Sequence, residues 1–242
     1  MSCKAVIFDY IGTLVNCNGY TMEASRDNLH RALFAEGFTV SKEKFLEAYI
    51  EAHEKYRKVR FEELREVTNS VWVAEALNDL GFQVDYNDYR INCALNVFFK
   101  DYIDTFELRI GAKKLIKKAK RTCRIGLISN FTFAPVIYSS LRILGINSLF
   151  DTVIVSQENG WRKPSTKIFN AALNKLGVEA QNAVYIGDSP LEDIKGANES
   201  GIGTIFLASQ FYSFEDLRKS QQLPNYSAKD LTEVSNYLTK FL

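Results

Sequence analysis

The sequence has almost no net charge, because its 30 basic and 29 acidic side chains leave +1 at pH 7. Nucleic-acid binding usually needs a basic excess against the phosphate backbone, so we expect no nucleic-acid partner. Histidine is scarce, and two residues in 242 are too few for most histidine-rich metal sites. The four cysteines have no CxxC spacing, so the sequence indicates neither a zinc ribbon nor a redox pair.

Long apolar runs are missing as well. A membrane span needs about 20 consecutive apolar residues, and the sequence offers no such stretch. The N-terminal sequence MSCKAVIFDY reaches an aspartate after a few apolar residues, unlike the core of a signal peptide. We therefore expect a cytoplasmic protein with no membrane partner, whose cysteines are buried as small hydrophobic side chains. The composition, with 46% hydrophobic and 24% charged residues, is typical of a globular protein.

Short runs of β-prone residues recur along the chain, and each ends at small or polar residues, as strands do. They lie at residues 5–8, 125–128, 152–155, 184–186 and 204–207. Helical patterns separate the later runs, and each is followed by a glycine, at 135–144, 166–176 and 191–199. This alternation predicts an α/β fold, with a Rossmann-like parallel sheet covered by helices on both faces.

A long helical stretch separates the first predicted strand from the second. Apolar periodicity predicts helices at 22–35, 42–58, 61–80 and 86–103. A further helix at 111–121 leads back to the sheet, and its five lysines are expected to form a solvated face rather than an anion-binding patch. We therefore predict two domains: residues 1–15 and 106–242 form the core, and residues 16–105 form an inserted helical cap.

Polar and charged residues follow the predicted strands, at the edge where open parallel sheets bind ligands. They are Asp9 after the first strand, Ser129 and Asn130 after the second, Lys163 before the helix at 166–176, and Asp188 with Asp193 after the fourth strand. Clustered carboxylates raise one another's pKa unless a cation lies between them. Mg²⁺ suits carboxylate and phosphate oxygens better than a soft-ligand metal does, so we predict a magnesium site.

A phosphate group bound there is expected to meet Mg²⁺, the Lys163 ammonium, the Ser129 hydroxyl and the backbone N–H groups of the turn at Gly12. The simplest chemistry is attack on phosphorus by a carboxylate, which forms an acyl phosphate that water later hydrolyses. Simpler roles are also open: Asp188 and Asp193 could cap the next helix, and Lys163 could be a solvated loop lysine.

Four motifs in this order resemble the haloacid dehalogenase-like (HAD) superfamily. They are IFDYIGTL, LISN, GWRKPSTKIF and YIGDSPLEDIKGANESGIGT, and with the elements between them they cover nearly the whole chain. The resemblance implies a Mg²⁺-dependent hydrolase that acts on a small phosphorylated metabolite through an aspartyl phosphate. It also implies roles for single residues: Asp9 as nucleophile, Lys163 as a catalytic and phosphate-holding residue, Thr13, Ser129 and Asn130 as phosphate-binding residues, and Asp9, Asp188, Asp193 and the Ile11 carbonyl as Mg²⁺ ligands, Asp193 through water.

One position departs from the phosphatases of that superfamily. They carry a second aspartate two residues after the nucleophile, which protonates the leaving group and then activates water, whereas this chain has Ile11 there. General acid–base groups contribute about 10²- to 10⁴-fold to a rate. We therefore expect weak activity that favours acidic leaving groups, such as aryl or acyl phosphates. As a hypothesis, His53 on the cap replaces the acid, although it could also be a packed cap histidine.

Other functions remain open. A 2-haloacid dehalogenase needs no proton donor, but dehalogenases of this superfamily usually have tyrosine where Ile11 stands, and Tyr10 is one position early. They also usually lack the first acid of the fourth motif, which is present here as Asp188. The phosphonoacetaldehyde hydrolase branch needs a cap lysine as a Schiff base, and no cap lysine is marked as desolvated. The last alternative is a non-catalytic domain that binds phosphate or protein, and the oligomeric state, monomer or homodimer, is open.

Overall fold

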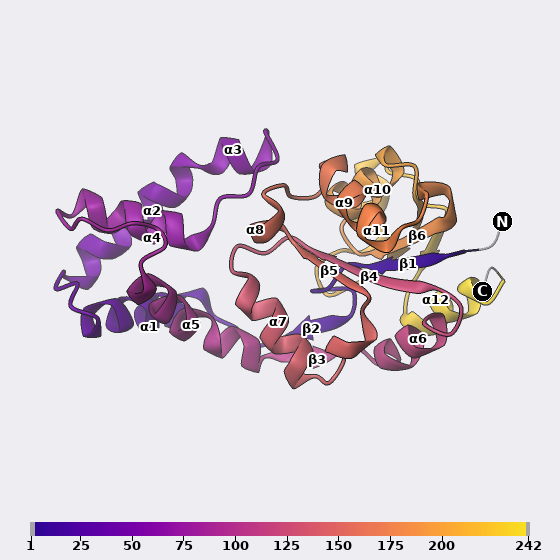
Figure 1. Cartoon of the computed structure of the whole chain (residues 1–242), viewed down its shortest axis with the longest axis horizontal. Helices are drawn as coiled ribbons and strands as arrows, with labels where there is room; N and C mark the ends of the chain where they lie inside the picture. Colours follow the sequence, from indigo (N-terminus) through magenta and orange to yellow (C-terminus); the bar gives the residue numbers. More distant parts are fainter. Residues whose placement is uncertain (1–2, 241–242) are drawn as a thin grey trace.

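A parallel six-stranded sheet forms the centre of the computed structural model, which describes residues 3–240 (Figure 1). The strands are β1 (Ala5–Phe8), β4 (Arg124–Ser129), β5 (Thr152–Val155), β6 (Ala183–Gly187), β7 (Gly203–Leu207) and β8 (Tyr226–Ala228). They are ordered β5, β4, β1, β6, β7, β8, and each neighbouring pair is parallel. The predicted α/β, Rossmann-like fold with an inserted helical unit is confirmed.

The strand order places β1 at a reversal of the chain. After β1 the chain adds β4 and β5 on one side of it, and then β6, β7 and β8 on the other. Open parallel sheets bind ligands at the carboxyl ends of the strands beside such a reversal. Asp9 is the first residue after β1, so the topology itself brings this carboxylate to the ligand-binding edge.

Helices cover both faces of the sheet. They are α6 (Ala112–Ala119), α7 (Ala134–Ile143), α8 (Ser156–Asn159), α9 (Thr166–Leu176), α10 (Lys195–Glu199), α11 (Phe214–Ser220) and α12 (Leu231–Leu238), with single turns at η1 (Asn147–Leu149), η2 (Ala180–Asn182) and η3 (Pro190–Ile194). Figure 1 shows α9 and α10 over one face and α6, α7 and α12 over the other. In β1, Val6 and Phe8 pack into one hydrophobic layer, and Ala5 and Ile7 pack into the opposite one.

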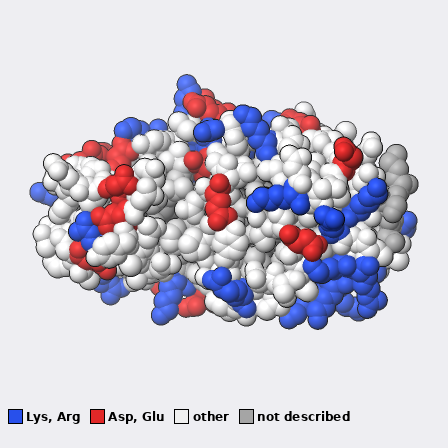
Figure 2. All heavy atoms as spheres, viewed as in Figure 1, with Lys and Arg blue, Asp and Glu red and all other residues white. Residues whose placement is uncertain are grey.

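The lysine-rich helix α6 is amphipathic. Leu115 and Ile116 are buried, while Lys113, Lys114 and Lys117 are exposed. Figure 2 shows Lys and Arg side chains gathered at the end of the molecule where Figure 1 places α6. The expected solvated face therefore holds for these three lysines, whereas Lys118 donates to Thr239 Oγ1 and Lys120 pairs with Asp151. The apolar face packs against the sheet.

The insertion begins and ends in a two-stranded antiparallel ribbon of β2 (Val15–Cys17) and β3 (Phe106–Leu108). Between them lie α1 (Met22–Ala35), α2 (Lys42–Lys55), α3 (Arg57–Phe61), α4 (Asn69–Asp79) and α5 (Tyr89–Asp104). α1 packs against α5, and α2 packs against α4. Figure 1 shows these helices, which we call the cap, at one end of an elongated molecule. The domain limits at 15 and 105 stay a prediction, and residues 1, 2, 241 and 242 lie outside the described residues.

The expected helix over 61–80 is wrong, because the loop 62–68 separates α3 from α4. The loop is bound to the core: the Glu66 N–H donates to the Gly160 carbonyl at 3.1 Å. Leu64 has a φ of 57°, a left-handed conformation that a helix cannot continue through. Tertiary contacts therefore override the apolar periodicity that favoured one long helix.

Smaller expectations also need correction. The helix expected at 42–58 ends at Lys55, and the helix expected at 86–103 begins at Tyr89, where Asp88 caps it. The three-residue strands β2, β3 and β8 were not predicted, because runs this short carry too little pattern. Cys3 and Cys123 are buried as expected, but Cys93 is exposed. Within residues 3–240 no helix has the length and apolar character that crossing a membrane requires.

Candidate active site

A tight turn after β1 starts the site. The Gly12 N–H donates to the Val15 carbonyl at 2.8 Å, and Gly12 has a φ of 95°, which favours glycine. A Cβ at this position would collide with the Asp188 carboxylate. Glycine therefore lets the loops after β1 and β6 approach each other, and this approach brings Asp9 and Asp188 together.

Three carboxylates meet at this edge of the sheet. Asp9, Asp188 and Asp193 each offer an oxygen, and these oxygens lie within 4.8 Å of one another. All three residues are buried, with at most 6% of their surface exposed. These are the three aspartates predicted from the sequence, and the fold brings them together.

Lys163 lies in the middle of the carboxylate cluster and is itself 2% exposed. Its Nζ donates to Asp9 Oδ1 at 2.7 Å and to Asp193 Oδ1 at 2.6 Å. The Tyr185 hydroxyl lies 3.2 Å from the same nitrogen and donates to Asp193 Oδ1 at 2.8 Å. Lys163 is thus not the solvated loop lysine that the sequence left open, because its ammonium is paired in the interior.

Asp193 also fixes the backbone of its own loop. Its Oδ2 accepts the N–H groups of Asp188 at 3.1 Å and of Ser189 at 2.9 Å. A Cβ at Gly187 would collide with the Asp193 side chain, so glycine is required there too. Ser189, rather than either aspartate, is the N-cap of η3, and its Oγ accepts the Glu192 N–H at 3.2 Å.

Burial dominates the electrostatics of the cluster. It raises the pKa of Asp9 to about 6, with Lys163 opposing the shift and Asp193 adding to it. It raises the pKa of Asp188 to about 8, and the charges of Asp9 and Asp193 add to the shift. Burial alone lowers the pKa of Lys163, but the attraction of Asp193 and Asp9 carries it well above its usual value. A single ammonium therefore does not balance the negative charge of the protein groups.

The residues present suit a hard cation. Among the described residues, Asp9 Oδ2 is buried without a hydrogen-bond partner, although its other oxygen is paired with Lys163. Asp188 accepts one bond, from the Ser209 hydroxyl to Oδ2 at 2.6 Å. By contrast, both oxygens of Asp193 are already occupied. Oxygen ligands and excess negative charge favour Mg²⁺ at Asp9 and Asp188, and a looser association with Asp193 stays a prediction.

The predicted phosphate-binding residues fall into two groups. Ser129 and Asn130 line a catalytic pocket of about 230 Å³, together with Asp9, Lys163 and Asp188. Asn130 positions Lys163: its Oδ1 accepts the Lys163 N–H at 2.8 Å, and its Nδ2 donates to the Lys163 carbonyl at 3.1 Å. Thr13 is fully buried and is not among the described residues that line the pocket, so its predicted role has no geometric support.

The position of the missing acid is occupied by an apolar side chain. Ile11 is half-buried and lines the catalytic pocket. Tyr10 is fully buried, and its hydroxyl lies 2.8 Å from Ser140 Oγ on α7. The Tyr10 side chain therefore packs into the core, and it does not stand in for the tyrosine that dehalogenases of this superfamily usually carry.

Several residues of the site escaped the sequence analysis. They are Tyr185 and Ser209, which donate hydrogen bonds to the aspartates, Glu192, whose Oε2 accepts from Asn130 Nδ2 at 2.9 Å, and Phe211 and Tyr212, which line the pocket. Ser209 follows β7 and could have been found by comparing every strand end. Tyr185 lies inside β6, where the sequence alone does not say which face a side chain takes.

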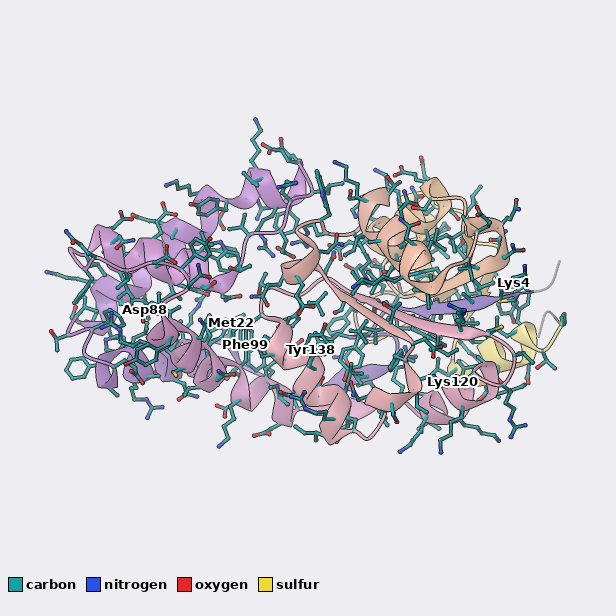
Figure 3. All side chains as sticks on the ribbon, in the orientation of Figure 1. Lys4, Met22, Asp88, Phe99, Lys120 and Tyr138 are labelled. Carbon is teal, nitrogen blue, oxygen red and sulfur yellow. The ribbon has the colours of Figure 1, made fainter. Side chains whose placement is uncertain are left out.

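A second hollow, which we call the cap cavity, lies between the cap and the core and has a volume of about 710 Å³. Figure 3 labels Met22 and Phe99, which both line it, on the side of the cap that faces the core. His53 lines the cap cavity but is not among the described residues of the catalytic pocket. Burial, and then the charge of Arg60, lowers the pKa of His53. The hypothesis that His53 is the general acid stays a prediction.

The fold and the site together define a class: an α/β protein with a buried carboxylate and lysine centre beneath an inserted helical cap. The chain belongs to the haloacid dehalogenase-like hydrolase family, whose family model matches residues 3–201. The resemblance stated from the four motifs is thereby confirmed.

Solved structures share the fold over the whole chain. The 2-haloacid dehalogenase from Pseudomonas syringae pv. Tomato DC3000 is 21% identical with a TM-score of 0.70, covering 99% of this chain and 100% of that one. The HAD-hydrolase YfnB from Bacillus subtilis, bound to magnesium, is 21% identical with a TM-score of 0.61 at the same coverage. At this identity the likeness concerns the fold alone.

Curated relatives match over shorter stretches. The glyceraldehyde 3-phosphate phosphatase of Methanopyrus kandleri is 36% identical over 100 residues, which are 40% of this chain and 43% of the relative. The pyrimidine 5'-nucleotidase YjjG of Escherichia coli is 32% identical over 131 residues, which are 54% of this chain and 56% of the relative. The match thus spans about half the length of these relatives.

Proposed function

We propose that the protein is a Mg²⁺-dependent phosphatase that hydrolyses a small phosphorylated metabolite through an aspartyl phosphate. One observation carries the proposal: Asp9 lies within a buried cluster of three carboxylates, with Lys163 on one oxygen and no hydrogen-bond partner among residues 3–240 on the other. The names of two curated relatives, a glyceraldehyde 3-phosphate phosphatase and a pyrimidine 5'-nucleotidase, support the same reaction class.

Asp9, Asp188 and the carbonyl of Ile11 would hold the metal directly, and Asp193 would associate with it more loosely. When bound, Mg²⁺ supplies positive charge that neutralises the carboxylates and the phosphate oxygens. The protein contributes the rest. Lys163 adds a fixed ammonium that can bind a phosphate oxygen, and Ser129 adds a hydroxyl from the end of β4. The Lys163 ammonium also orients the Asp9 carboxylate through its bond to Oδ1.

The proposed reaction is a double displacement. A carboxylate oxygen of Asp9 attacks phosphorus, the bond from phosphorus to the leaving oxygen breaks, and an acyl phosphate forms on Asp9. Water then attacks the phosphorus of this intermediate, which releases phosphate and restores the carboxylate. Ile11 has no proton to give, so the leaving oxygen takes its proton from water. A lost acid–base group lowers a rate by about 10²- to 10⁴-fold, and we therefore infer a preference for acidic leaving groups.

The test compares kcat/KM for p-nitrophenyl phosphate with that for an alkyl phosphate, with and without Mg²⁺. We expect Mg²⁺-dependent turnover, a preference of at least about 100-fold for the aryl ester, and loss of turnover in Asp9→Asn. Equal efficiency on both esters would contradict the missing-acid argument. Halide release from a 2-haloacid without Mg²⁺ would replace the proposal with a dehalogenase. Phosphate binding without any turnover would replace it with a non-catalytic domain.

A further inference from the structure

The cap cavity adjoins the catalytic pocket. Asn130 and Phe211 line both hollows, and an ester bound at Asp9 can therefore extend its leaving group toward the cap cavity. Its volume of about 710 Å³ is enough for a whole small molecule. Aromatic side chains dominate its wall, among them Tyr49, Trp72 and Phe99. Flat ring surfaces of this kind favour a leaving group that is itself flat and aromatic.

Arg26, on α1, brings an unbalanced positive charge to this wall. Its side chain is half-buried and makes no ion pair or hydrogen bond within residues 3–240, and its Nε is buried without an acceptor. The other arginine of the cavity, Arg60, is neutralised by Glu66, whose Oε1 lies 3.0 Å from its Nε. Glu54 is at the rim, with a side chain 56% exposed, and its carboxylate lies 3.6 Å from His53 Nδ1. Arg26 is therefore free to receive an anion.

Trp72 provides a second donor in the same wall. Its side chain is 3% exposed, and its indole Nε1 is buried without an acceptor among the described residues. Buried donors are rarely left unpaired, because an unmade hydrogen bond costs free energy. Two unpaired donors in one cavity wall, one of them charged, indicate that an acceptor enters with a ligand.

We propose that Arg26 and Trp72 bind a second anionic group, carried by the leaving group of the substrate. This inference rests on the phosphatase function proposed above and narrows it. The preferred substrates are then phosphate monoesters of a phenol that also bears a carboxylate or a second phosphate. Such a phenolic leaving group is acidic, which suits a site that lacks its own proton donor.

The experiment compares 4-carboxyphenyl phosphate with its neutral amide, 4-carbamoylphenyl phosphate, in the presence of Mg²⁺. We expect kcat/KM to favour the carboxylate by about 10- to 100-fold, as one charge-assisted hydrogen-bonded pair allows. In Arg26→Gln this preference should fall to within about threefold. Differences in leaving-group reactivity cancel when wild type and variant are compared on the same two esters. A parallel measurement uses 1,4-phenylene bisphosphate, in which a second phosphate stands in place of the carboxylate. Its kcat/KM, compared with that of 4-carboxyphenyl phosphate, shows whether phosphate is the better second anion.

Matched variants separate recognition from folding. Arg31→Gln changes an exposed arginine on the same helix, which hydrogen-bonds Asn28, and should keep the full preference. Trp72→Phe retains a ring but removes the donor, and should reduce the preference by about three- to tenfold. Arg26→Lys keeps the charge without the planar fork, and should retain part of the preference.

A binding measurement gives a readout apart from turnover. Calorimetric titration of metal-free protein should show 4-hydroxybenzoate binding at least about tenfold more tightly than 4-hydroxybenzamide, and Arg26→Gln should abolish the difference. Turnover of both esters without a charge preference, or a preference that survives in Arg26→Gln, would overturn this inference and leave the phosphatase proposal intact. If no phosphate ester is hydrolysed with Mg²⁺, both proposals fail together.

Discussion

Restoring the missing acid is the most direct perturbation of the catalytic pocket. Ile11→Asp places a carboxyl group two residues after Asp9, at a position that lines the pocket. We expect kcat/KM for an alkyl phosphate to rise by about 100-fold, the lower end of the range for general acid catalysis. The lower end applies because the new carboxyl joins three carboxylates that already lie within 4.8 Å of one another. Turnover of p-nitrophenyl phosphate should change by less than about threefold, since its leaving group needs no proton.

The substitution also affects stability. Full burial of an isoleucine side chain contributes about 1.5 to 3 kcal/mol, and Ile11 is half-buried, so losing it should cost about 1 to 2 kcal/mol. Repulsion from the neighbouring carboxylates adds to this cost without metal. A domain with a stability of about 5 to 15 kcal/mol still folds after such a loss. Urea unfolding with and without Mg²⁺ measures the change.

The assay is the ratio of kcat/KM for the alkyl ester to that for the aryl ester. Ile11→Asn is the matched control, because the amide has nearly the shape of the acid but no transferable proton, and its ratio should stay at the wild-type value. The reasoning is refuted if a folded Ile11→Asp variant keeps the wild-type ratio, or if Ile11→Asn gains as much as Ile11→Asp.

Three further predictions concern the surroundings of the site. Tyr185→Phe removes the hydroxyl that donates to Asp193, and should lower the free energy of unfolding by about 1 to 3 kcal/mol in a urea titration; an unchanged midpoint would contradict the bond. Gly126→Ala brings a Cβ to 3.0 Å from Leu176 Cδ1 beneath α9, and should cost about 1 to 3 kcal/mol by the same measurement. Burial lowers the pKa of His53, so its imidazole binds a proton more readily in the unfolded chain than in the folded protein. Lowering the pH below about 6.5 therefore favours the unfolded chain and reduces the free energy of unfolding. Wild type should therefore lose more stability than His53→Gln between pH 7 and pH 5, and alkyl phosphate turnover that is unchanged in the same variant would exclude His53 as the acid.

Much of the fold followed from local pattern. The strands at 5–8 and 152–155 and the helix at 166–176 were placed at their observed limits, because apolar runs and glycine stops are strong local signals. The loop at 62–68 was not, since its conformation depends on hydrogen bonds to residues far along the chain. Local periodicity contains no information about such partners.

The residues of the site likewise fall into those that the sequence locates and those that only the folded structure reveals. Asp9 and Asp188 follow strands, so the rule for parallel sheets locates them from sequence. Thr13 follows the same strand as Asp9, but it is fully buried and does not line the catalytic pocket, and position along the chain does not reveal this. Arg26 was also missed. Nothing in the sequence distinguishes it from the exposed Arg31, and its lack of a partner becomes visible only when the cap and the core are placed together.

A chain of ion pairs and hydrogen bonds connects the cap to the catalytic lysine. Glu66 comes from the loop 62–68, its side chain is 1% exposed, and it lies 3.4 Å from Arg162 Nη1. Arg162 Nη2 donates to Glu192 Oε1 at 3.1 Å, and the other oxygen of Glu192 accepts from Asn130, which holds the backbone of Lys163 on both sides. A buried carboxylate must stay paired, because breaking such a pair leaves an uncompensated charge. The same hydrogen bonds that seat the cap loop therefore also fix Lys163 beside Asp9, and moving the cap loop away from the core must weaken the support of the catalytic centre.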